Sequence, residues 1–192
     1  TAATEIYTLS LHDALPIFAV RAAQTGHLVF STLHTNDSIS AITRLLDMGI
    51  DPFLLGSSLV CSIAQRLAQR ICPHCKRPDP DLPVDLRQEM AAALGLAPES
   101  IEASRGEGCI ECQLKGHRGR VGIYEFFVMT DEVADLLGPS IKTGQLRAAA
   151  RTHGWRTLRE HAWPKVQAGL VATSEIQRLT RRIKPSALEV AS

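Results

Sequence analysis

Four of the five cysteines are the residues whose type and spacing most clearly predict chemistry. They form two Cys-x-x-Cys pairs, Cys-Pro-His-Cys and Cys-Ile-Glu-Cys, with 33 residues between the pairs. Two residues inside each pair allow a tight turn to aim both sulfur atoms at one point, and two such turns supply the thiolates of a tetrahedral zinc site. A closed shell of four sulfurs leaves no position for water or substrate. We therefore expect a structural Zn²⁺ ion, which stabilises the segment between the pairs, to be bound by Cys72, Cys75, Cys109 and Cys112.

Other uses of these cysteines stay open. Iron–sulfur clusters and rubredoxin-type iron centres bind to similar cysteine pairs, and a thioredoxin-like redox site needs only one pair. In a reducing compartment such pairs indicate metal or redox chemistry rather than structural disulfides. His74 is expected to be a loop residue, because four sulfurs already complete the shell. Cys61 stands alone in an apolar segment and is expected to be a small core residue.

A histidine at the end of a predicted strand is the second candidate for chemistry. Residues 27–33 have the β-branched and aromatic content of a buried strand, and His34 follows them directly. Asn36 and Asp37 then offer a helix N-cap, so that hydrogen-bond donors near His34 can face an anion. A lone histidine at a strand end more often has a structural role than a functional one. His27, at the start of the same strand, is explained by a structural hydrogen bond as well as by a functional role.

The loop that holds phosphates in P-loop ATPases does not occur in these residues. The pattern Gly-x-x-x-x-Gly-Lys-Ser/Thr is absent, and the sequence contains no Gly-Lys dipeptide. The acidic segments that hold Mg²⁺ and orient water in such enzymes are also missing. We therefore expect that this chain does not hydrolyse ATP on its own.

Helices and strands alternate in the part of the chain that carries His34, which predicts an α/β fold. Asp37 caps a helix with apolar residues at helical spacing, and Gly49 ends it. Asp51, followed by Pro52, caps a further short helix. The expected elements are a helix over 19–24, a strand over 27–33, helices beginning at 37 and at 53, and a strand over 59–67.

The rest of the chain contains an insertion and a series of helices. We expect a helix over 84–94 between the cysteine pairs, a strand over 120–128, and helices over 131–137, 144–152, 157–169 and 173–180. Thr157 and Glu160 form a capping box, whereas Pro164 should kink its helix or end it early. The sequence thus predicts part of an α/β core over 18–70, a tetracysteine subdomain over 71–124 and a C-terminal helical subdomain over 125–192.

The first 17 residues are expected not to be native. Residues 8–17, Thr-Leu-Ser-Leu-His-Asp-Ala-Leu-Pro-Ile, resemble the in-frame translation of a widely used sequencing-adapter oligonucleotide. The seven residues before them continue that translation with one mismatch, at Ala3. If this interpretation holds, the natural protein continues upstream of Phe18, and residues 1–17 carry no information about the fold.

Composition and charge argue against two other classes of protein. The 21 basic residues are balanced by 20 acidic ones, and only 5% of residues are aromatic. A zinc-ribbon module that binds nucleic acid is therefore a weaker alternative, because little is available to hold phosphates or stack on bases. A non-enzymatic docking domain is a further alternative. No apolar run approaches the length of a membrane-spanning helix, so we expect a soluble intracellular chain.

Several motifs in register resemble the secretion ATPases of the type II secretion and type IV pilus assembly family. The first is the run around His34, which is similar to the histidine box of that family. The motifs follow in the expected order from Phe18 to about Thr180: AAQTGHLVFSTLHTND, AITRLLDMGIDPF, AQRLAQRICPHC, GCIECQLKGHRGRVGIYEF and RTLREHAWPKVQAGL.

The resemblance implies a partial RecA-like P-loop ATPase core with a four-cysteine zinc insertion and a C-terminal helical subdomain. It implies a parent protein that binds ATP and Mg²⁺, assembles as a hexamer and powers pilin or pseudopilin assembly. Such a parent would lie at the cytoplasmic face of the bacterial inner membrane and contact the platform proteins of the secretion or pilus machinery, with no nucleic acid as partner. His34 matches the histidine near the terminal phosphate of the nucleotide, and Arg66 lies in a recurrent family segment as a candidate phosphate contact.

Overall fold

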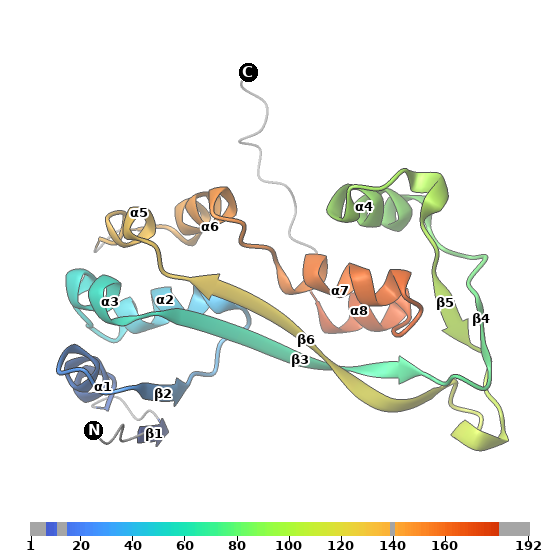
Figure 1. Cartoon of the computed structure of the whole chain (residues 1–192), viewed down its shortest axis with the longest axis horizontal. Helices are drawn as coiled ribbons and strands as arrows, with labels where there is room; N and C mark the ends of the chain where they lie inside the picture. The colour runs from blue at the N-terminus through green and yellow to red at the C-terminus, as the bar shows by residue number, and fades with distance from the viewer. Residues whose placement is uncertain (1–6, 11–14, 139–140, 181–192) are drawn as a thin grey trace. The chain divides into compact units, whose positions relative to one another are not determined.

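The computed structural model describes residues 7–10, 15–138 and 141–180, and the chain forms two compact units (Figure 1). Of the described residues, those up to Ala64 and those between Glu125 and Arg156 make up the first unit, and those between Gln65 and Tyr124 and from Thr157 onward make up the second. Parts of the predicted adapter segment and the last residues of the predicted helical subdomain lie outside the described residues. None of the helices in the described part of the chain combines the length and the hydropathy needed to cross a bilayer.

From residue 19 onward the first unit contains the alternating helices and strands expected from the sequence, so the α/β prediction is confirmed. The strand Tyr7–Ser10 lies in residues 1–17, for which no element was expected. Strand β1 pairs in parallel with β2, with Tyr7 opposite Val29 and Ser10 opposite Thr32. The unit comprises β1 (Tyr7–Ser10), α1 (Leu15–Gln24), β2 (Val29–Thr32), α2 (Ser38–Asp47), α3 (Pro52–Ser58), α5 (Asp131–Ala134) and α6 (Thr143–Thr152), together with the beginning of β3 (Cys61–Ile71) and the end of β6 (His117–Val128).

Two predicted helix caps in this unit are confirmed. The carboxylate of Asp37 accepts the backbone N–H of Ser40 at 2.7 Å, which satisfies one of the free donors at the start of α2. The carboxylate of Asp51 accepts the N–H groups of Phe53 and Leu54, and Pro52 occupies the first turn of α3. The helices therefore begin where the sequence signals place them.

Apolar side chains from both ends of the chain build the core of the first unit. Helix α2 contributes Ile39 and Ile42, both fully buried, because positions three apart lie on one face of a helix. They belong to a cluster with residues from α3, β6, α5, α6 and the segment after α6: Leu55, Phe127, Val133, Leu146, Ala150 and Trp155.

The second unit contains the remaining strands and helices. Strand β4 (Lys76–Pro78) pairs antiparallel with β5 (Ser104–Gly106), with Lys76 opposite Gly106. Its helices are α4 (Val84–Leu94), α7 (Leu158–Gln167) and α8 (Thr173–Leu179), with short 3₁₀ turns η1 (Pro98–Ser100) and η2 (Ile110–Cys112). Its core includes Met90, Ile123, Trp163, Val166 and Ile176.

Strands β3 and β6 form a two-stranded ribbon and run in opposite directions (Figure 1). The sequence predicted both strands, and each is longer than expected. Side chains near the end of β6 alternate, as the pleat of a strand requires. Ile123, Glu125 and Phe127 are buried, whereas the residues between and after them are exposed.

The C-terminal helices differ from the sequence expectation in two respects. The sequence predicted one helical subdomain over 125–192, but residues 125–156 group with the first unit and the described residues after 156 with the second. Helix α7 continues through Pro164 to Gln167, so the early end is wrong, and the alternative of a kink at Pro164 stays a prediction. The capping box that opens α7 is confirmed, since Glu160 accepts the Thr157 N–H at 2.7 Å and the Thr157 hydroxyl accepts the Glu160 N–H at 3.2 Å.

Candidate functional site

The four predicted cysteines come together in the second unit, and their sulfur atoms all lie within 4.8 Å of one another. The Sγ atoms of Cys72 and Cys109 are 3.9 Å apart, as are those of Cys75 and Cys112, and those of Cys109 and Cys112 are 3.7 Å apart. Four sulfurs at about 2.3 Å from a tetrahedral zinc ion are about 3.8 Å from one another. The spacing therefore fits a single metal ion of that size.

Pairing of two short strands brings the two cysteine turns to the same place. Cys75 directly precedes β4, and β5 ends at Gly106, shortly before Cys109, so the β4–β5 ladder fixes the two turns side by side. Two backbone hydrogen bonds close the arrangement. Glu107 N–H donates to the Cys75 carbonyl at 3.1 Å, and Cys72 N–H donates to the Gly116 carbonyl at 3.0 Å.

Backbone N–H groups point at the sulfur atoms. Gly108 N–H lies 3.2 Å from Cys75 Sγ, and the N–H groups of Cys109 and Gly116 lie 3.2 and 3.3 Å from Cys112 Sγ. Gly108 and Gly116 have φ values of 96° and 74°, a region that favours glycine. Donors of this kind stabilise thiolate, which is the form that binds metal ions.

Cys112 and Cys75, one from each cysteine pair, differ in thiol acidity. Burial disfavours the Cys112 thiolate, but the N–H groups of Cys109 and Gly116 outweigh that cost and lower the pKa of Cys112 to about 6. Burial raises the pKa of Cys75 to about 11 despite the Gly108 N–H. A divalent cation would therefore displace protons from this cluster when it binds, most of all from Cys75.

The cluster is the only group of three or more candidate metal ligands among the described residues. His74, between the first two cysteines, is exposed and does not belong to it. Cys61 is exposed on β3 in the first unit, so it is not the core residue that the sequence predicted.

The second candidate, His34, is exposed in the loop between β2 and α2, two residues beyond the end of the strand. Arg66 is exposed on β3 and belongs to the second unit. The two side chains therefore belong to separate units, and their predicted roles at a nucleotide stay predictions.

Residues that the sequence did not single out hold the helix after His34. The backbone N–H and the hydroxyl group of Ser38 both donate to the Glu125 carboxylate, and Trp155 Nε1 donates to the Ser38 hydroxyl at 3.2 Å. Asp37, which the sequence did predict as the cap of this helix, also forms an ion pair with Arg147 at 2.7 Å. The sequence feature that could have indicated this buried contact is Glu125, a lone carboxylate in the otherwise apolar end of a predicted strand.

An apolar hollow of about 400 Å³ lies within the first unit, lined by α1, β2, α2, α3 and the start of β3. Its lining includes Val20, Phe30, Leu45, Leu59 and Ile63, of which Phe30 and Ile63 are both 54% exposed. The hollow contains no titratable side chain other than Cys61. It therefore offers apolar packing surface rather than catalytic groups.

Comparison with known proteins assigns the chain to a family. The type II/IV secretion system protein family matches residues 14–178. The chain is 43% identical over 164 residues to type II secretion system protein E of Pseudomonas aeruginosa and 41% identical over 163 residues to the type II secretion system protein HxcR of the same species. It is 38% identical over 167 residues to the type IV pilus assembly ATPase PilB of Acinetobacter baylyi. These matches cover 84–85% of this chain but only 28–32% of the relatives, so the chain spans about a third of their length.

Two solved structures have a fold similar to that of this chain. The pilus retraction motor PilT with bound ADP matches 96% of this chain and 41% of its own, with a TM-score of 0.57 and 21% identity. The Legionella pneumophila ATPase DotB matches 91% of this chain and 38% of its own, with a TM-score of 0.59 and 18% identity. The predicted α/β fold class is confirmed, because the chain shares its fold with part of each of these two structures. The chain belongs to the type II/IV secretion system protein family.

Proposed function

We propose that the chain is the C-terminal part of a motor ATPase that powers the assembly of pilins or pseudopilins in type IV pilus biogenesis or type II secretion. Support comes from the family match over residues 14–178 and from curated relatives named as type II secretion proteins and as a pilus assembly ATPase. The parent would bind ATP and Mg²⁺ and work as a hexamer. Its place would be the cytoplasmic face of the inner membrane, against platform proteins of the machinery.

In this proposal His34 contacts the terminal phosphate of the nucleotide. Its position favours that role, because it is exposed beyond a strand end and just before the N-terminus of α2. The hydrogen bond from Ser38 to Glu125 and the ion pair of Asp37 with Arg147 fix the end of the loop between β2 and α2. Arg66, exposed on β3, would contact either a phosphate or a carboxylate.

The four cysteines would hold a structural Zn²⁺ ion. The sulfur spacing and the N–H groups aimed at the sulfurs fit such an ion. Because four thiolates complete a tetrahedral shell, the ion would stabilise the fold of the second unit and take no part in hydrolysis.

The chain alone would not hydrolyse ATP, because its 192 residues contain no Gly-x-x-x-x-Gly-Lys-Ser/Thr loop. The exposed apolar side chains around the hollow in the first unit fit a parent in which further segments of the core pack there.

The observation that carries the proposal is the match of residues 14–178 to the family. The first test is a long read of genomic DNA upstream of the Phe18 codon from an independent clone. An open frame that continues upstream and encodes the phosphate-binding loop before an acidic segment supports the proposal. A start codon directly before residues 1–17 contradicts it and favours a stand-alone docking domain.

The second test uses the full-length gene product. His34→Ala should lower kcat about a hundredfold, the scale reported for loss of one donor to a transition-state charge. His153→Ala, at an exposed histidine that faces Glu132 across 3.7 Å, is the matched control and should keep wild-type turnover. Equal kcat values for the two variants would remove His34 from the proposed mechanism.

A further inference from the structure

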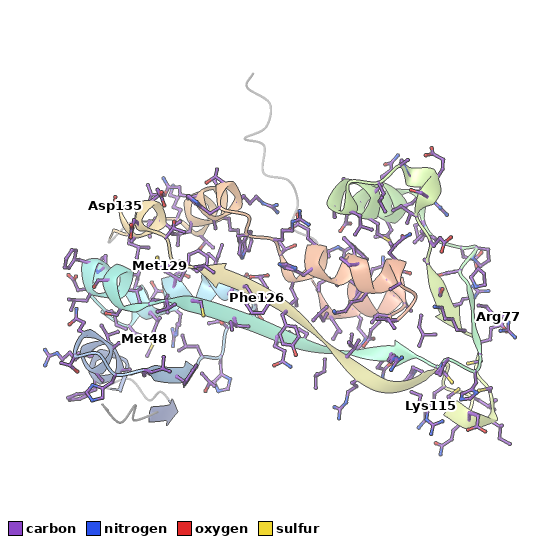
Figure 2. The ribbon with its side chains drawn as sticks, viewed as in Figure 1. Met48, Arg77, Lys115, Phe126, Met129 and Asp135 are labelled. Atoms are coloured by element: carbon purple, nitrogen blue, oxygen red, sulfur yellow. The ribbon has the colours of Figure 1, made fainter. Side chains whose placement is uncertain are left out.

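The loop that carries His34 ends at a buried serine that two distant residues hold. The backbone N–H and the hydroxyl group of Ser38 both donate to the Glu125 carboxylate, at 2.8 and 2.5 Å. Glu125 directly precedes Phe126, which Figure 2 labels on the last part of β6. The indole N–H of Trp155, in the segment after α6, donates to the Ser38 hydroxyl at 3.2 Å. Ser38, Glu125 and Trp155 are 1%, 2% and 6% exposed, so little water competes for these hydrogen bonds.

A third distant side chain holds the residue before this serine. One carboxylate oxygen of Asp37 accepts the Ser40 N–H and caps α2, and the other pairs with the Arg147 guanidinium at 2.7 Å. The three distant partners all belong to residues 125–156, which group with the first unit. Asp37 and Ser38 are called the loop anchor below. One C-terminal segment thus holds both residues of the loop anchor.

Helix capping alone does not account for this arrangement. Asp51, which caps α3 in the same unit, does so from an exposed position. At the start of α2 the chain in addition buries the Glu125 carboxylate, which costs free energy unless hydrogen bonds compensate it. Satisfied buried networks of this kind rigidify the segment that they hold. The loop anchor is therefore held more firmly than the start of a helix requires.

The position of His34 depends on the backbone of its loop. Its side chain is exposed, so packing does not fix it. The Thr35 N–H donates to the Leu33 carbonyl at 3.1 Å, which closes a three-residue turn with His34 at its centre. Only Asn36 lies between this turn and the loop anchor. With so short a connection, a shift of the loop anchor also moves His34.

Hydrogen bonds at the start of α2 leave the contact with an anion to the histidine. The N–H of Ser38 is already taken by the Glu125 carboxylate. The N–H of Ser40 is taken by Asp37. A helix end whose donors face carboxylates is a poor binding site for a further anion. Contact with a phosphate in this loop therefore falls to His34.

We propose that three residues of the C-terminal segment, Glu125, Arg147 and Trp155, are positioning residues for the loop that carries the proposed phosphate contact. Through the loop anchor they hold the His34 imidazole where it meets the terminal phosphate of the nucleotide. The inference rests on the role of His34 in the proposed function. It adds that the segment containing α5 and α6 acts on turnover, because a small displacement of a catalytic group lowers the rate steeply even when its cause lies far from the reacting atoms.

The test measures ATP turnover by the full-length gene product and combines each variant with His34→Ala. Trp155→Phe removes the indole N–H and keeps an aromatic ring, and Arg147→Gln removes the ion pair with the loop anchor. Each should lower kcat about tenfold in the wild-type background. Each should change kcat by less than about twofold in the His34→Ala background, because no imidazole is left to position. A variant that only reduces the folded fraction would lower kcat by the same factor in both backgrounds.

Trp163→Phe is the matched control. Trp163 is fully buried in the core of the second unit, and its indole N–H has no hydrogen-bond partner among the described residues. The substitution therefore makes the same change to a buried indole without breaking a hydrogen bond. It should leave kcat within about twofold of the wild-type value.

The inference is overturned if neither Trp155→Phe nor Arg147→Gln lowers kcat. It is also overturned if the loss is the same with and without His34, or if the Trp163→Phe control loses as much. Should Trp155→Phe fail to fold by circular dichroism, Arg147→Gln decides alone, since that side chain is 30% exposed and its loss leaves the core intact. An unchanged kcat for His34→Ala by itself would contradict the role of His34 in the proposed function, and this inference with it. The single His34→Ala variant thus separates the two failures.

Discussion

Glu125, near the end of β6, holds Ser38 at the start of α2 through two hydrogen bonds. Its Oε1 atom lies 2.8 Å from the Ser38 backbone nitrogen and 2.5 Å from the Ser38 hydroxyl oxygen. The residues are 87 positions apart in the chain and are 2% and 1% exposed. The Ser38 hydroxyl also accepts the indole N–H of Trp155. A buried carboxylate thus links the His34-bearing end of the first unit to its C-terminal segment.

Loss of the Glu125 carboxylate should destabilise the first unit. Glu125→Leu leaves the buried N–H and hydroxyl group of Ser38 without their acceptor, which should lower the free energy of unfolding by about 3 kcal/mol. Glu125→Gln keeps one acceptor oxygen and should cost about 1 kcal/mol. Urea unfolding followed by tryptophan fluorescence measures both. Asp135→Asn, at an exposed carboxylate in the same unit, is the control and should stay within about 0.5 kcal/mol of wild type. A Glu125→Leu variant as stable as the control would show that the contact contributes nothing.

Asp37 should contribute through two separable interactions. It caps α2 through the Ser40 N–H and forms an ion pair with Arg147. Asp37→Ala should therefore cost about 1 kcal/mol for the cap and about 1 kcal/mol more for the partly buried pair. A double-mutant cycle with Arg147→Gln isolates the second part. Asp51→Ala, which removes the cap of α3 alone, should cost about 1 kcal/mol and show no coupling to Arg147→Gln. Equal coupling in both cycles would contradict the assignment of the ion pair.

Signals that act between near neighbours in the sequence were sufficient to predict most of the fold. Asp37, Asp51 and Thr157 cap helices where the sequence placed the caps, because capping depends on residues two or three positions apart. The cysteine pairs were also readable, since two residues between ligands already fix a turn. We expected the two turns to meet in space because four thiolates can bind one metal ion. The pairing of β4 with β5, which brings the turns together, was not predicted.

Contacts between distant residues could not be predicted from one sequence. The Glu125–Ser38 contact joins residues 87 apart, and the ion pair of Glu89 with Arg159 joins residues 70 apart. The division of the C-terminal helices between the two units also depends on which core each apolar face enters. Helical spacing defines that face but does not name its partner. Pro164 is tolerated inside α7, whose buried residues on either side, Ala162, Trp163 and Val166, pack in the core of the second unit.

The cysteine cluster should bind one metal ion per chain. Titration with Co²⁺ should produce the ligand-to-metal charge-transfer absorption of cobalt thiolates, and Zn²⁺ should displace the cobalt. Cys109→Ser should abolish that absorption and destabilise the second unit by several kcal/mol, because ligand binding and folding are coupled there. Cys61→Ser, at an exposed cysteine in the first unit, is the control and should titrate like wild type.

The metal affinity should rise with pH. Binding displaces thiol protons, and the pKa of Cys75, raised by burial to about 11, keeps that thiol protonated at neutral pH in the absence of metal. Competition with a chromophoric chelator at pH 6 and pH 8 measures the change. An affinity that does not depend on pH would show that the ligands are not thiolates that compete with protons.

Glu175 on α8 should make the stability of the second unit depend on pH. Its carboxylate accepts hydrogen bonds from the Arg178 guanidinium at 2.7 and 2.8 Å and from the backbone N–H of Gln69 on β3 at 2.8 Å. Arg178 first and the Gln69 N–H after it lower the pKa of Glu175 below its ordinary value of 4.5, although burial opposes them. The folded state therefore favours the charged form more than the unfolded state does.

The sign of the effect follows from linkage. A carboxyl group whose pKa is lowered by folding adds stability that is fully present above the pKa of the unfolded state and is lost as the pH falls through the folded-state pKa. Glu175→Gln should therefore be less stable than wild type by about 1.5 kcal/mol at pH 7. That deficit should shrink as the pH falls below 4.5, the ordinary value for this group. Urea unfolding of both proteins at pH 7 and pH 3 gives the two differences, and the comparison at equal pH cancels any loss of metal. Glu99→Gln, at an exposed carboxylate in the same unit, should show no deficit at either pH. A deficit of equal size at pH 7 and pH 3 would mean that packing of the Glu175 side chain, rather than its charge, holds α8 against β3.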